Sequence, residues 1–588
     1  MLRINIKERS YNSWTVCNTD TLEQITLNNF DPIVHKLFNN DTFTMDNGNV
    51  NIVYSTLRIN ENIPGVLILD EGKTYGRENK PIGGKTYTNR SLNVYSGRLL
   101  YKCIPDDKRL PIFLVPFEIK KMDFNKDLKN MYVTIKYKHW NEKHPYANVN
   151  QMIGPVDILD HFYEYQLYCK SLATSISKFN QDTKNAINNH HFKEDHDQFI
   201  AAICQQNLHI SDRTNRKTFT IDPNKTSDYD DAVSIKRVDN HNIVSVYIAN
   251  VSIFMDFLNL WSSFSKRIST IYLPDCKRPM LPTILSDCLC SLQSGKRRIT
   301  LAIDIEVDDE GNVIDVSWSN VVIRVFNNYV YEELNLLTDF EYISLFNIVT
   351  KMAMKYENET TIKNSHDLVS FLMILTNNLC AKELIKCRTG IFRTTNNNCD
   401  NKELDVPSNL PEDVTKFIKG WRSVTAQYVE YKNTNDNAHE MLNLDVYTHI
   451  TSPIRRLVDL LNLIELQTSM GLHTFSKEAH DFYNNWISQL DYINTTMRSI
   501  RKVQNDCSIL NMCVNDDSIL RDEYDGYSFD KMLRNDGLYQ YFVYLPKLKI
   551  TSKITLIDSL DNYENRKYKL FIFNDEESFK RKIRLQLL

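Results

Sequence analysis

Hydrophobic and polar residues alternate in short runs over residues 41–172, with turn residues between the runs. NVNIVYSTLRI and MYVTIKYKHW are typical of these runs, and their spacing is that of strands in small barrels or sandwiches. The pattern returns near the C-terminus in GLYQYFVYLPKLKI and RKYKLFIF. We therefore expect an N-terminal extension at 1–40, small β-barrels at 41–105 and 106–172, and a third barrel at 513–588.

Between these barrels the hydrophobic spacing changes to three and four residues, which predicts helices. DQFIAAICQQNL is one such stretch and lies in a predicted helical connector at residues 173–212. Residues 213–512 combine hairpin strands, such as RITLAIDIEV, with long helical stretches. A chain of 588 residues is too long for one core, so we predict an α+β multidomain protein.

Composition and charge add little about partners. The formal net charge is −4, with 24% charged residues, so a polyanion site would have to be a local group of Lys and Arg. The 12 cysteines contain no C-x-x-C pair, which favours reduced thiols over a metal or disulfide framework. No apolar run of about 18 residues and no signal peptide were found. We therefore expect a cytoplasmic protein with no membrane association.

The most informative stretch is residues 219–250, where four carboxylates within ten residues precede two alternating strands. The carboxylates are Asp222, Asp228, Asp230 and Asp231. A solvated acidic turn is the ordinary interpretation of such a loop. The flanking apolar strands predict burial instead, where unpaired charge is costly. Mg²⁺ and Mn²⁺ prefer oxygen ligands, so the sequence favours a divalent-cation site.

A second stretch, YTHITSPIRRLVDLL, predicts a helix capped by Ser452 that begins at Pro453. Arg455 and Arg456 then lie in its first turn, where the helix dipole disfavours cations. An anionic partner would resolve this conflict. A bound phosphate and the protein's own carboxylates are both candidates.

Basic and aromatic residues also alternate in YVTIKYKHW, where Lys136, Lys138 and Trp140 are predicted to share one strand face. Cations and rings together suit single-stranded nucleic acid, which needs both. An ordinary sheet surface explains the pattern equally well.

Taken together, these stretches resemble the RNase II/RNase R (RNB) family of exoribonucleases. FTIDPNKTSDYDDA is similar to the family's acidic signature, YLPDCKRPMLPTILSDCLCSL to the segment after it, and YTHITSPIRRLVD to its TSPIRR stretch. The three occur in family order. The resemblance implies an RNB catalytic domain at 213–512, flanked by two N-terminal cold-shock-like barrels and one C-terminal OB-type barrel.

The resemblance also implies roles for single residues. Asp222, Asp228, Asp230 and Asp231 would be catalytic and would hold Mg²⁺, for which Mn²⁺ can substitute. Arg455 would contact the scissile phosphate, and Arg456 a neighbouring phosphate. Tyr272 would stack on the terminal base, and Tyr331 would lie near the 3′-terminal nucleotide unless it is a core residue. Leu372 and Leu457 depart from the family pattern, which usually has Glu and Tyr there.

The leading hypothesis is therefore a processive, hydrolytic 3′→5′ exoribonuclease that releases nucleoside 5′-monophosphates. Its partner would be the 3′ end of single-stranded RNA, with a monomer as the candidate oligomeric state and no protein partner indicated. A catalytically silent RNA-binding or scaffold protein is the alternative. A metal-dependent DNA nuclease or phosphatase would share the carboxylates but would not need RNA-type barrels.

Overall fold

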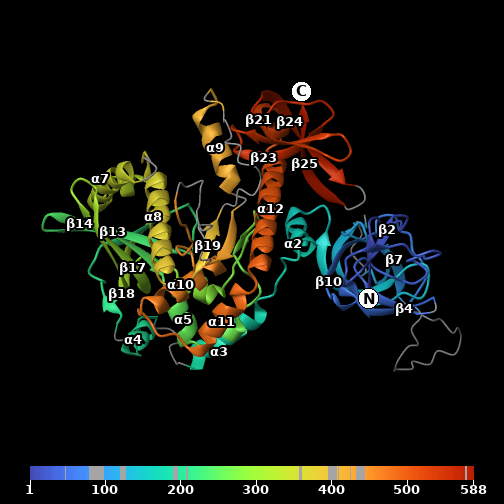
Figure 1. The fold of residues 1–588 in the computed structure, drawn as a ribbon, viewed down its shortest axis with the longest axis horizontal. Helices are drawn as coiled ribbons and strands as arrows, with labels where there is room; N and C mark the ends of the chain where they lie inside the picture. Colours follow the sequence, from blue (N-terminus) through green and yellow to red (C-terminus); the bar gives the residue numbers. More distant parts are fainter. Residues whose placement is uncertain are drawn as a thin grey trace. The chain divides into compact units, whose positions relative to one another are not determined.

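The structure is a computed structural model that describes residues 1–588 except 47, 79–97, 120–127, 190–195, 207–208, 357–360, 395–406, 408, 424–425, 432–443 and 576–578. The chain forms two compact units (Figure 1). Unit 1 comprises Met1–Ala173, Leu273–Asp275 and Val503–Leu588, and unit 2 comprises Thr174–Tyr272 and Cys276–Lys502.

Unit 1 begins with a five-stranded sheet of order β3-β2-β1-β4-β5. Its strands are β1 (Leu2–Ile6), β2 (Trp14–Asn18), β3 (Gln24–Ile25), β4 (Thr42–Asp46) and β5 (Asn49–Tyr54). β1 pairs with both β2 and β4. The predicted extension at 1–40 is therefore wrong, because its alternating residues supply the central strand of the first β-domain.

A closed barrel of order β10-β8-β7-β6-β9 follows. It consists of β6 (Ile63–Leu67), β7 (Leu99–Pro105), β8 (Phe113–Phe117), β9 (Met131–His139) and β10 (Tyr146–Pro155), with α1 (Thr56–Ile59) before it and α2 (Leu159–Cys169) after it. β7 and β8 pair as one antiparallel hairpin. The predicted boundary between 105 and 106 is wrong, because it cuts this hairpin.

The proposed cationic and aromatic face on β9 is not formed. Trp140 lies beyond the end of β9 and is buried, with its ring stacked on Phe38 at 5.0 Å between centroids. Lys136 and Lys138 point outward but form ion pairs with Glu61 and Glu78. The ring is buried because it completes the core shared by the first sheet and the barrel.

The C-terminal part of unit 1 is an antiparallel sheet of order β23-β22-β21-β24-β25. Its strands are β21 (Glu523–Leu533), β22 (Tyr539–Leu545), β23 (Ile550–Leu556), β24 (Asn565–Asp575) and β25 (Lys580–Leu587), and α13 (Ser518–Arg521) precedes them. The strands lie where the sequence predicted the third barrel. Lys580, the first residue of the basic run, is buried and paired with Asp106.

Unit 2 is built on a six-stranded sheet of order β11-β18-β12-β13-β14-β17. The strands are β11 (Ser211–Asp212), β12 (Thr218–Asp222), β13 (Asp231–Val238), β14 (His241–Ala249), β17 (Arg297–Asp308) and β18 (Val313–Val330). The first part of β18 pairs with β17 and its last part with β12. One long strand thus joins both sides of the sheet and supports the acidic loop between β12 and β13.

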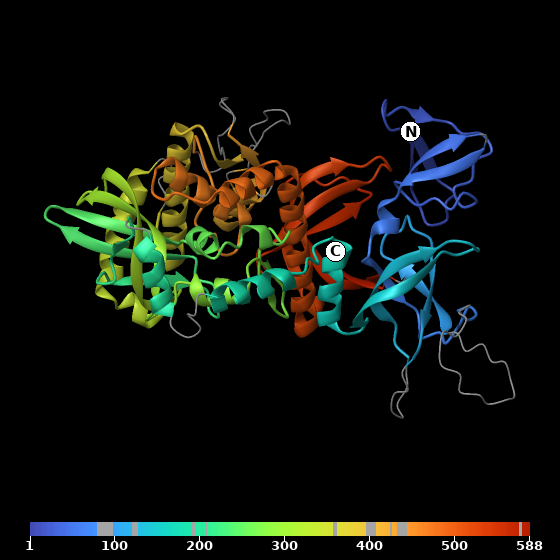
Figure 2. The ribbon, with the colours of Figure 1, turned by 90° about the horizontal axis from the view of Figure 1, so that it is seen from below.

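Helices and short strands complete unit 2 (Figure 2). α7 packs on β13 and on α8, and α10 packs on α5, α8 and α11. The helices are α3 (Ser177–Asn189), α4 (His196–Gln206), α5 (Val251–Phe257), α6 (Leu334–Leu337), α7 (Phe340–Lys355), α8 (Ser365–Lys386), α9 (Glu412–Ser423), α10 (Leu457–Ser469) and α11 (Lys477–Ile487). α12 (Leu490–Asn515) runs from unit 2 into unit 1. The short strands are β15 (Ile271–Tyr272), β16 (Lys277–Arg278), β19 (Ile391–Thr394) and β20 (Gln427–Glu430).

One described helix, α8, is long and apolar enough to cross a membrane by length and composition. α8 meets these criteria by mean hydropathy and not as an unbroken apolar run, because Asp367, Asn377 and Asn378 interrupt it. Of its most apolar window, 61% is buried inside the protein. Leu368, Leu372 and Leu375 belong to the main core of unit 2, so α8 has the burial of a core helix.

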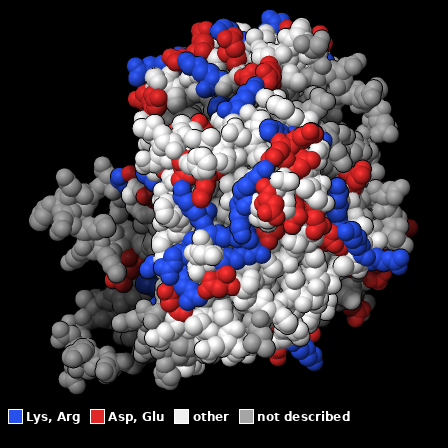
Figure 3. Space-filling view, turned by 90° about the vertical axis from the view of Figure 1, so that its left-hand side faces the viewer, with Lys and Arg blue, Asp and Glu red and all other residues white. Residues whose placement is uncertain are grey.

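Charged residues on the face seen in Figure 3 are mixed rather than segregated. Lys and Arg form a band, and groups of Asp and Glu lie directly beside it. Ion pairs between described residues, such as those of Lys217 with Asp339 and Glu341, show the same close mixing of charge. The small net charge therefore reflects local compensation.

Candidate active site

The four predicted carboxylates come together at one end of β12 and β13. Asp222 is the last residue of β12 and Asp231 the first of β13. Because the two strands are antiparallel neighbours, the end of one lies beside the start of the other. Asp228 and Asp230 belong to the connecting loop and are both more than 90% buried.

The backbone of this loop is held by a small hydrogen-bond network. The Tyr229 N–H donates to Ser291 Oγ at 3.0 Å, and the Ser291 hydroxyl donates to the Ser227 carbonyl at 2.8 Å. Arg298 is only 1% exposed and donates to the carbonyls of Ser291 and Cys288, each at 2.6 Å. This buried arginine, which the sequence analysis missed, orders the turn on which the loop rests.

Asp230 forms hydrogen bonds with residues of the second predicted stretch, YTHITSPIRRLVDLL. Its Oδ1 accepts from the Ile454 N–H at 2.8 Å, and its Oδ2 accepts from Arg455 Nε at 2.9 Å. Arg455 Nη2 donates to Ser452 Oγ at 3.0 Å, and the arginine side chain remains 42% exposed. The fold thus brings together two segments about 225 residues apart in sequence. The guanidinium of Arg455 is hydrogen-bonded to Asp230 through Nε.

The predicted helix start at Pro453 is wrong, because α10 begins at Leu457. Arg456 has an extended backbone and bridges to Ser269, so the helix cannot include it. Its side chain donates to Asp459 Oδ1 at 2.7 Å. Of the two candidate partners for these arginines, the structure shows the protein's own carboxylates for both.

Asp228 has partners that the sequence analysis did not anticipate. Its Oδ2 accepts from the Tyr272 hydroxyl at 2.8 Å, and its Oδ1 accepts from Lys277 Nζ at 3.1 Å. Lys277 also pairs with Asp287 at 3.0 Å. Lys277 follows Tyr272 in the segment after the acidic signature, and this position was the only signal that could have identified it.

Burial and mutual repulsion dominate the electrostatics of the carboxylates. Burial raises the pKa of Asp230 to about 7, against the opposing effect of Arg455. Burial also raises the pKa of Asp222 to about 6. The pKa of Asp231 lies well above its usual range because of burial and the charges of Asp222 and Asp230. The site therefore holds more negative charge than its own cations balance.

Tyr331 lies close to Asp222 and Asp231. Its N–H donates to the Asp222 carbonyl at 3.2 Å. Burial and the charges of Asp231 and Asp222 raise the pKa of its phenol to about 12. Its ring also contacts the core of unit 2, so both interpretations offered for it remain open. Leu372 and Leu457, the two departures from the family pattern, are buried apolar residues.

The donor chemistry fits a divalent cation at Asp222 and Asp231. Asp222 Oδ2 is buried without a hydrogen-bond partner among the described residues, and the two carboxylates raise each other's energy. Asp228 and Asp230 have both carboxylate oxygens in bonds to protein donors. In keeping with this, no three His, Cys, Asp or Glu side chains of the described residues are placed to hold one ion.

Comparison with known proteins identifies the domain that carries this site. The RNB domain profile matches residues 210–344 and 338–471, a span that includes every site residue described above. The chain carries an RNB domain at residues 210–471. A second profile, the Dis3-like cold-shock domain 2, matches residues 100–161, which include β7 to β10 of the closed barrel.

Individual relatives agree with this assignment. Ribonuclease R of Chlamydia pneumoniae is 26% identical over 313 residues, which cover 41% of this chain and 45% of the relative. The chain thus spans less than half the length of that curated relative. The structure of Mycoplasma genitalium RNase R with ribose-methylated single-stranded RNA matches with a TM-score of 0.65 and 15% identity over 100% of both chains.

A third match is to the solved structure of a protein described as a pseudonuclease. The yeast pseudonuclease Ssd1 matches with a TM-score of 0.57 and 14% identity, over 89% of this chain and 69% of Ssd1. At these identities the structural matches show the fold alone. This RNB-domain protein thus has a multidomain α+β architecture of the RNase R type, with RNB and cold-shock or OB domains.

Proposed function

We propose that this RNB-domain protein is a hydrolytic exoribonuclease that removes nucleotides from the 3′ end of single-stranded RNA. The observation that carries the proposal is the four-carboxylate cluster with Arg455 on Asp230, inside the matched RNB domain. The names of the relatives support it. An intracellular location follows from the substrate and belongs to the same proposal.

In the reaction, a water oxygen bonds to the phosphorus of the last phosphodiester. The bond from that phosphorus to the 3′ oxygen of the preceding nucleotide breaks, and that oxygen takes up a proton. The products are a nucleoside 5′-monophosphate and an RNA shortened by one residue. A divalent cation, Mg²⁺ or Mn²⁺, held by Asp222 and Asp231 would neutralise charge on the phosphate and lower the pKa of bound water.

The protein's own groups would position the RNA. Arg455 has one side on Asp230 and the rest of its side chain partly exposed, so it is suited to contact the scissile phosphate. Tyr272 is 41% exposed and held at its hydroxyl by Asp228, which leaves its ring for base stacking. Arg456 and Tyr331 remain proposed RNA contacts, with Arg456 needing to share its charge with Asp459.

The test is digestion of a 5′-labelled single-stranded RNA with Mg²⁺, resolved at single-nucleotide resolution. We expect a ladder that shortens from the 3′ end with release of 5′-monophosphates. Asp230→Asn should abolish this and keep RNA binding in a gel-shift assay. Asp315→Asn is a matched control, because Asp315 is an exposed carboxylate on β18 outside the site. An Asp230→Asn protein as fast as wild type would refute the assigned site.

A second candidate is a catalytically silent RNA-binding protein. It is favoured by the engagement of Asp228 with Lys277 and Tyr272, because a carboxylate with two protein partners is less available to a cation. The same assay separates the two functions. RNA that is bound but never shortened with Mg²⁺ or Mn²⁺ would establish the silent function.

A further inference from the structure

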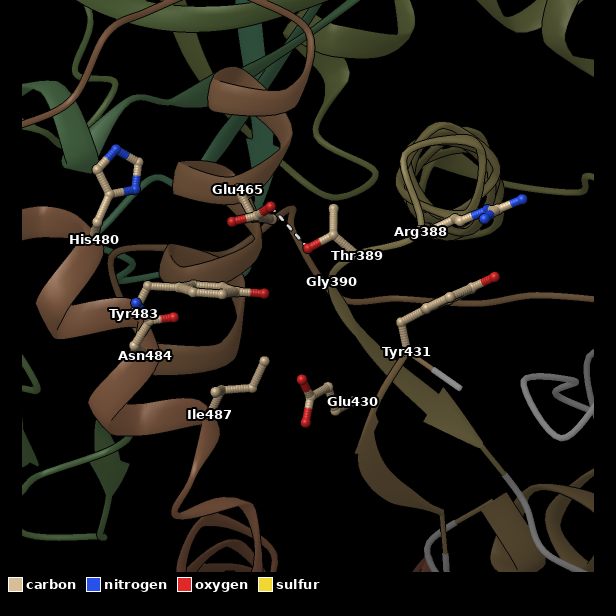
Figure 4. A pocket seen from close by; sticks show the side chains of 10 residues that line it. All are labelled: Arg388, Thr389, Gly390, Glu430, Tyr431, Glu465, His480, Tyr483, Asn484 and Ile487. Carbon is tan, nitrogen blue, oxygen red and sulfur yellow. Dashed lines mark hydrogen bonds between the residues drawn. The ribbon is translucent and has the colours of Figure 1, made fainter. Parts of the chain in front are cut away.

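A separate cavity of about 280 Å³ lies in unit 2. Its walls come from the residues before β19, the end of β20, α10 and α11 (Figure 4). The lining residues that matter here are Thr389, Glu430, Tyr431, Glu465, Tyr483 and Ile487. None of them belongs to the carboxylate site or to the reaction proposed above.

Two carboxylates in this cavity lack cationic partners. Glu465 Oε1 accepts from Thr389 Oγ1 at 2.7 Å and from Ser469 Oγ at 3.3 Å, both neutral donors. Neither Glu465 nor Glu430 forms an ion pair with a Lys, Arg or His of the described residues. Arg388 also lines the cavity, but its guanidinium points away from both carboxylates (Figure 4). The cavity is therefore acidic.

An aromatic ring with an unused hydroxyl forms another wall. Tyr483 is 7% exposed, and its hydroxyl lies near Thr389 and Gly390 without a well-formed hydrogen bond to the described residues. Its ring extends between Glu465 and Glu430 in Figure 4. Burial and the charges of Glu465 and Glu430 raise its pKa above the usual range, against the opposing effect of Thr389 and Gly390. Ile487 adds an apolar surface.

We propose that this cavity binds a small organic ammonium ion, such as an aliphatic amine or diamine. Glu430 and Glu465 supply charge-assisted acceptors for N–H donors. The Tyr483 ring offers a face to a cation, and Ile487 contacts methylene groups. The volume is near the lower limit of small-molecule sites, which suits a ligand of a few carbon atoms.

The chemistry of the walls argues against other occupants. A phosphate or carboxylate ligand would lie beside Glu430 and Glu465, which form no ion pair with a cation of the described residues; the basic residues that line the cavity are Arg388 and His480. A metal ion would use Glu430 and Glu465 but would leave the Tyr483 ring and the Ile487 wall without a contact. An organic cation uses the ring and the apolar wall as well as the charges.

The test is calorimetric titration of RNA-free protein with putrescine at fixed ionic strength. We expect one saturable site, and Glu430→Gln or Glu465→Gln should each weaken binding about tenfold. Gln at 465 keeps an acceptor for Thr389, so the fold is preserved. Glu478→Gln is the matched control, because Glu478 is an exposed carboxylate on α11 that does not line the cavity. Its affinity should stay within about twofold of wild type.

Further measurements distinguish a free amine from a lysine side chain as the ligand. They also test whether binding is only a nonspecific effect of charge. Tighter binding of Nα-acetyl-lysine amide than of putrescine would support the site with a protein side chain as its natural ligand. The absence of saturable binding of either probe would overturn the proposal. Displacement of putrescine by a lower concentration of Mg²⁺, or equal weakening by Glu478→Gln, would also overturn it. None of these outcomes depends on RNA hydrolysis, so they leave the proposed function separately testable.

Discussion

Two buried acidic regions on the same six-stranded sheet of unit 2 differ in whether cationic side chains balance their negative charge. Asp304, in β17, is 8% exposed and is bound through both oxygens by Arg213, at 2.9 and 2.7 Å. Arg216 lies 3.7 Å away, and the Ser245 hydroxyl donates at 2.6 Å. At the other region, between β12 and β13, burial and neighbouring carboxylates raise the pKa of Asp222 and of Asp231, and neither forms an ion pair with a Lys or Arg of the described residues.

The difference separates a structural carboxylate from a functional one. A buried charge with excellent partners is costly to break. Buried like charges raise each other's pKa and weaken the fold unless a ligand supplies the missing positive charge. The Asp304 region is thus complete in the protein alone, whereas under the proposed function the carboxylate site would be completed by a cation and an RNA phosphate. Four substitutions test this contrast.

The largest effect is expected for Asp231→Asn. This change should lower the rate of RNA digestion about 10²-fold or more, because it removes a charge placed to act on the reacting phosphate. It should leave the thermal midpoint unchanged or raise it, because repulsion from Asp222 and Asp230 disappears. Digestion rates and thermal unfolding of the same preparation check both parts. A destabilised variant with normal activity would reverse the contrast.

Asp304→Asn should do the opposite. Loss of the carboxylate leaves Arg213 buried without its partner, so unfolding should become easier by about 3 kcal/mol. Urea denaturation measures this change. The digestion rate per folded molecule should match wild type at a temperature where both proteins are folded. A specific loss of activity without loss of stability would mean that Asp304 belongs to the working site.

Lys277→Gln tests whether the ammonium competes with a cation for Asp228. Removing a positive charge 3.1 Å from Asp228 Oδ1 should lower the Mg²⁺ concentration for half-maximal rate about threefold. Lys277→Arg keeps the charge and should stay close to wild type. The measurement is a Mg²⁺ titration of digestion rate. A higher Mg²⁺ requirement for the Gln variant would show that Lys277 supports the site instead.

Tyr272→Phe should have a modest effect, of the same order as Lys277→Gln. It removes one hydrogen bond to Asp228 and keeps the ring, so the rate should fall about fivefold. Tyr272→Leu removes the ring as well and should lower the rate further and change the length of the final product. Digestion of a labelled RNA, resolved on a gel, measures both the rate and the length of the final product. A Phe variant as slow as the Leu variant would assign the role to the hydroxyl alone.

Much of the fold was predictable from local pattern. The strand runs at 513–588 and the hairpin after the acidic loop form as expected, because alternation and turn residues act over short distances. The boundaries at 40 and 105 failed because pairing of β1 with β4, and of β7 with β8, depends on which strands meet. The start of α10 failed because Arg456 pairs with Ser269, a residue distant in sequence.

The sequence by itself determined which side chains the site contains: four carboxylates ahead of two strands, and two arginines close to the start of a helix. Only the tertiary structure decided how those side chains are used. It placed Arg455 on Asp230, Lys277 and Tyr272 on Asp228, and buried Asp231 close enough to Asp222 and Asp230 for their charges to raise its pKa. The physical reason is that residue spacing controls strands and turns, whereas charge pairing acts through space between segments that only the folded core brings together.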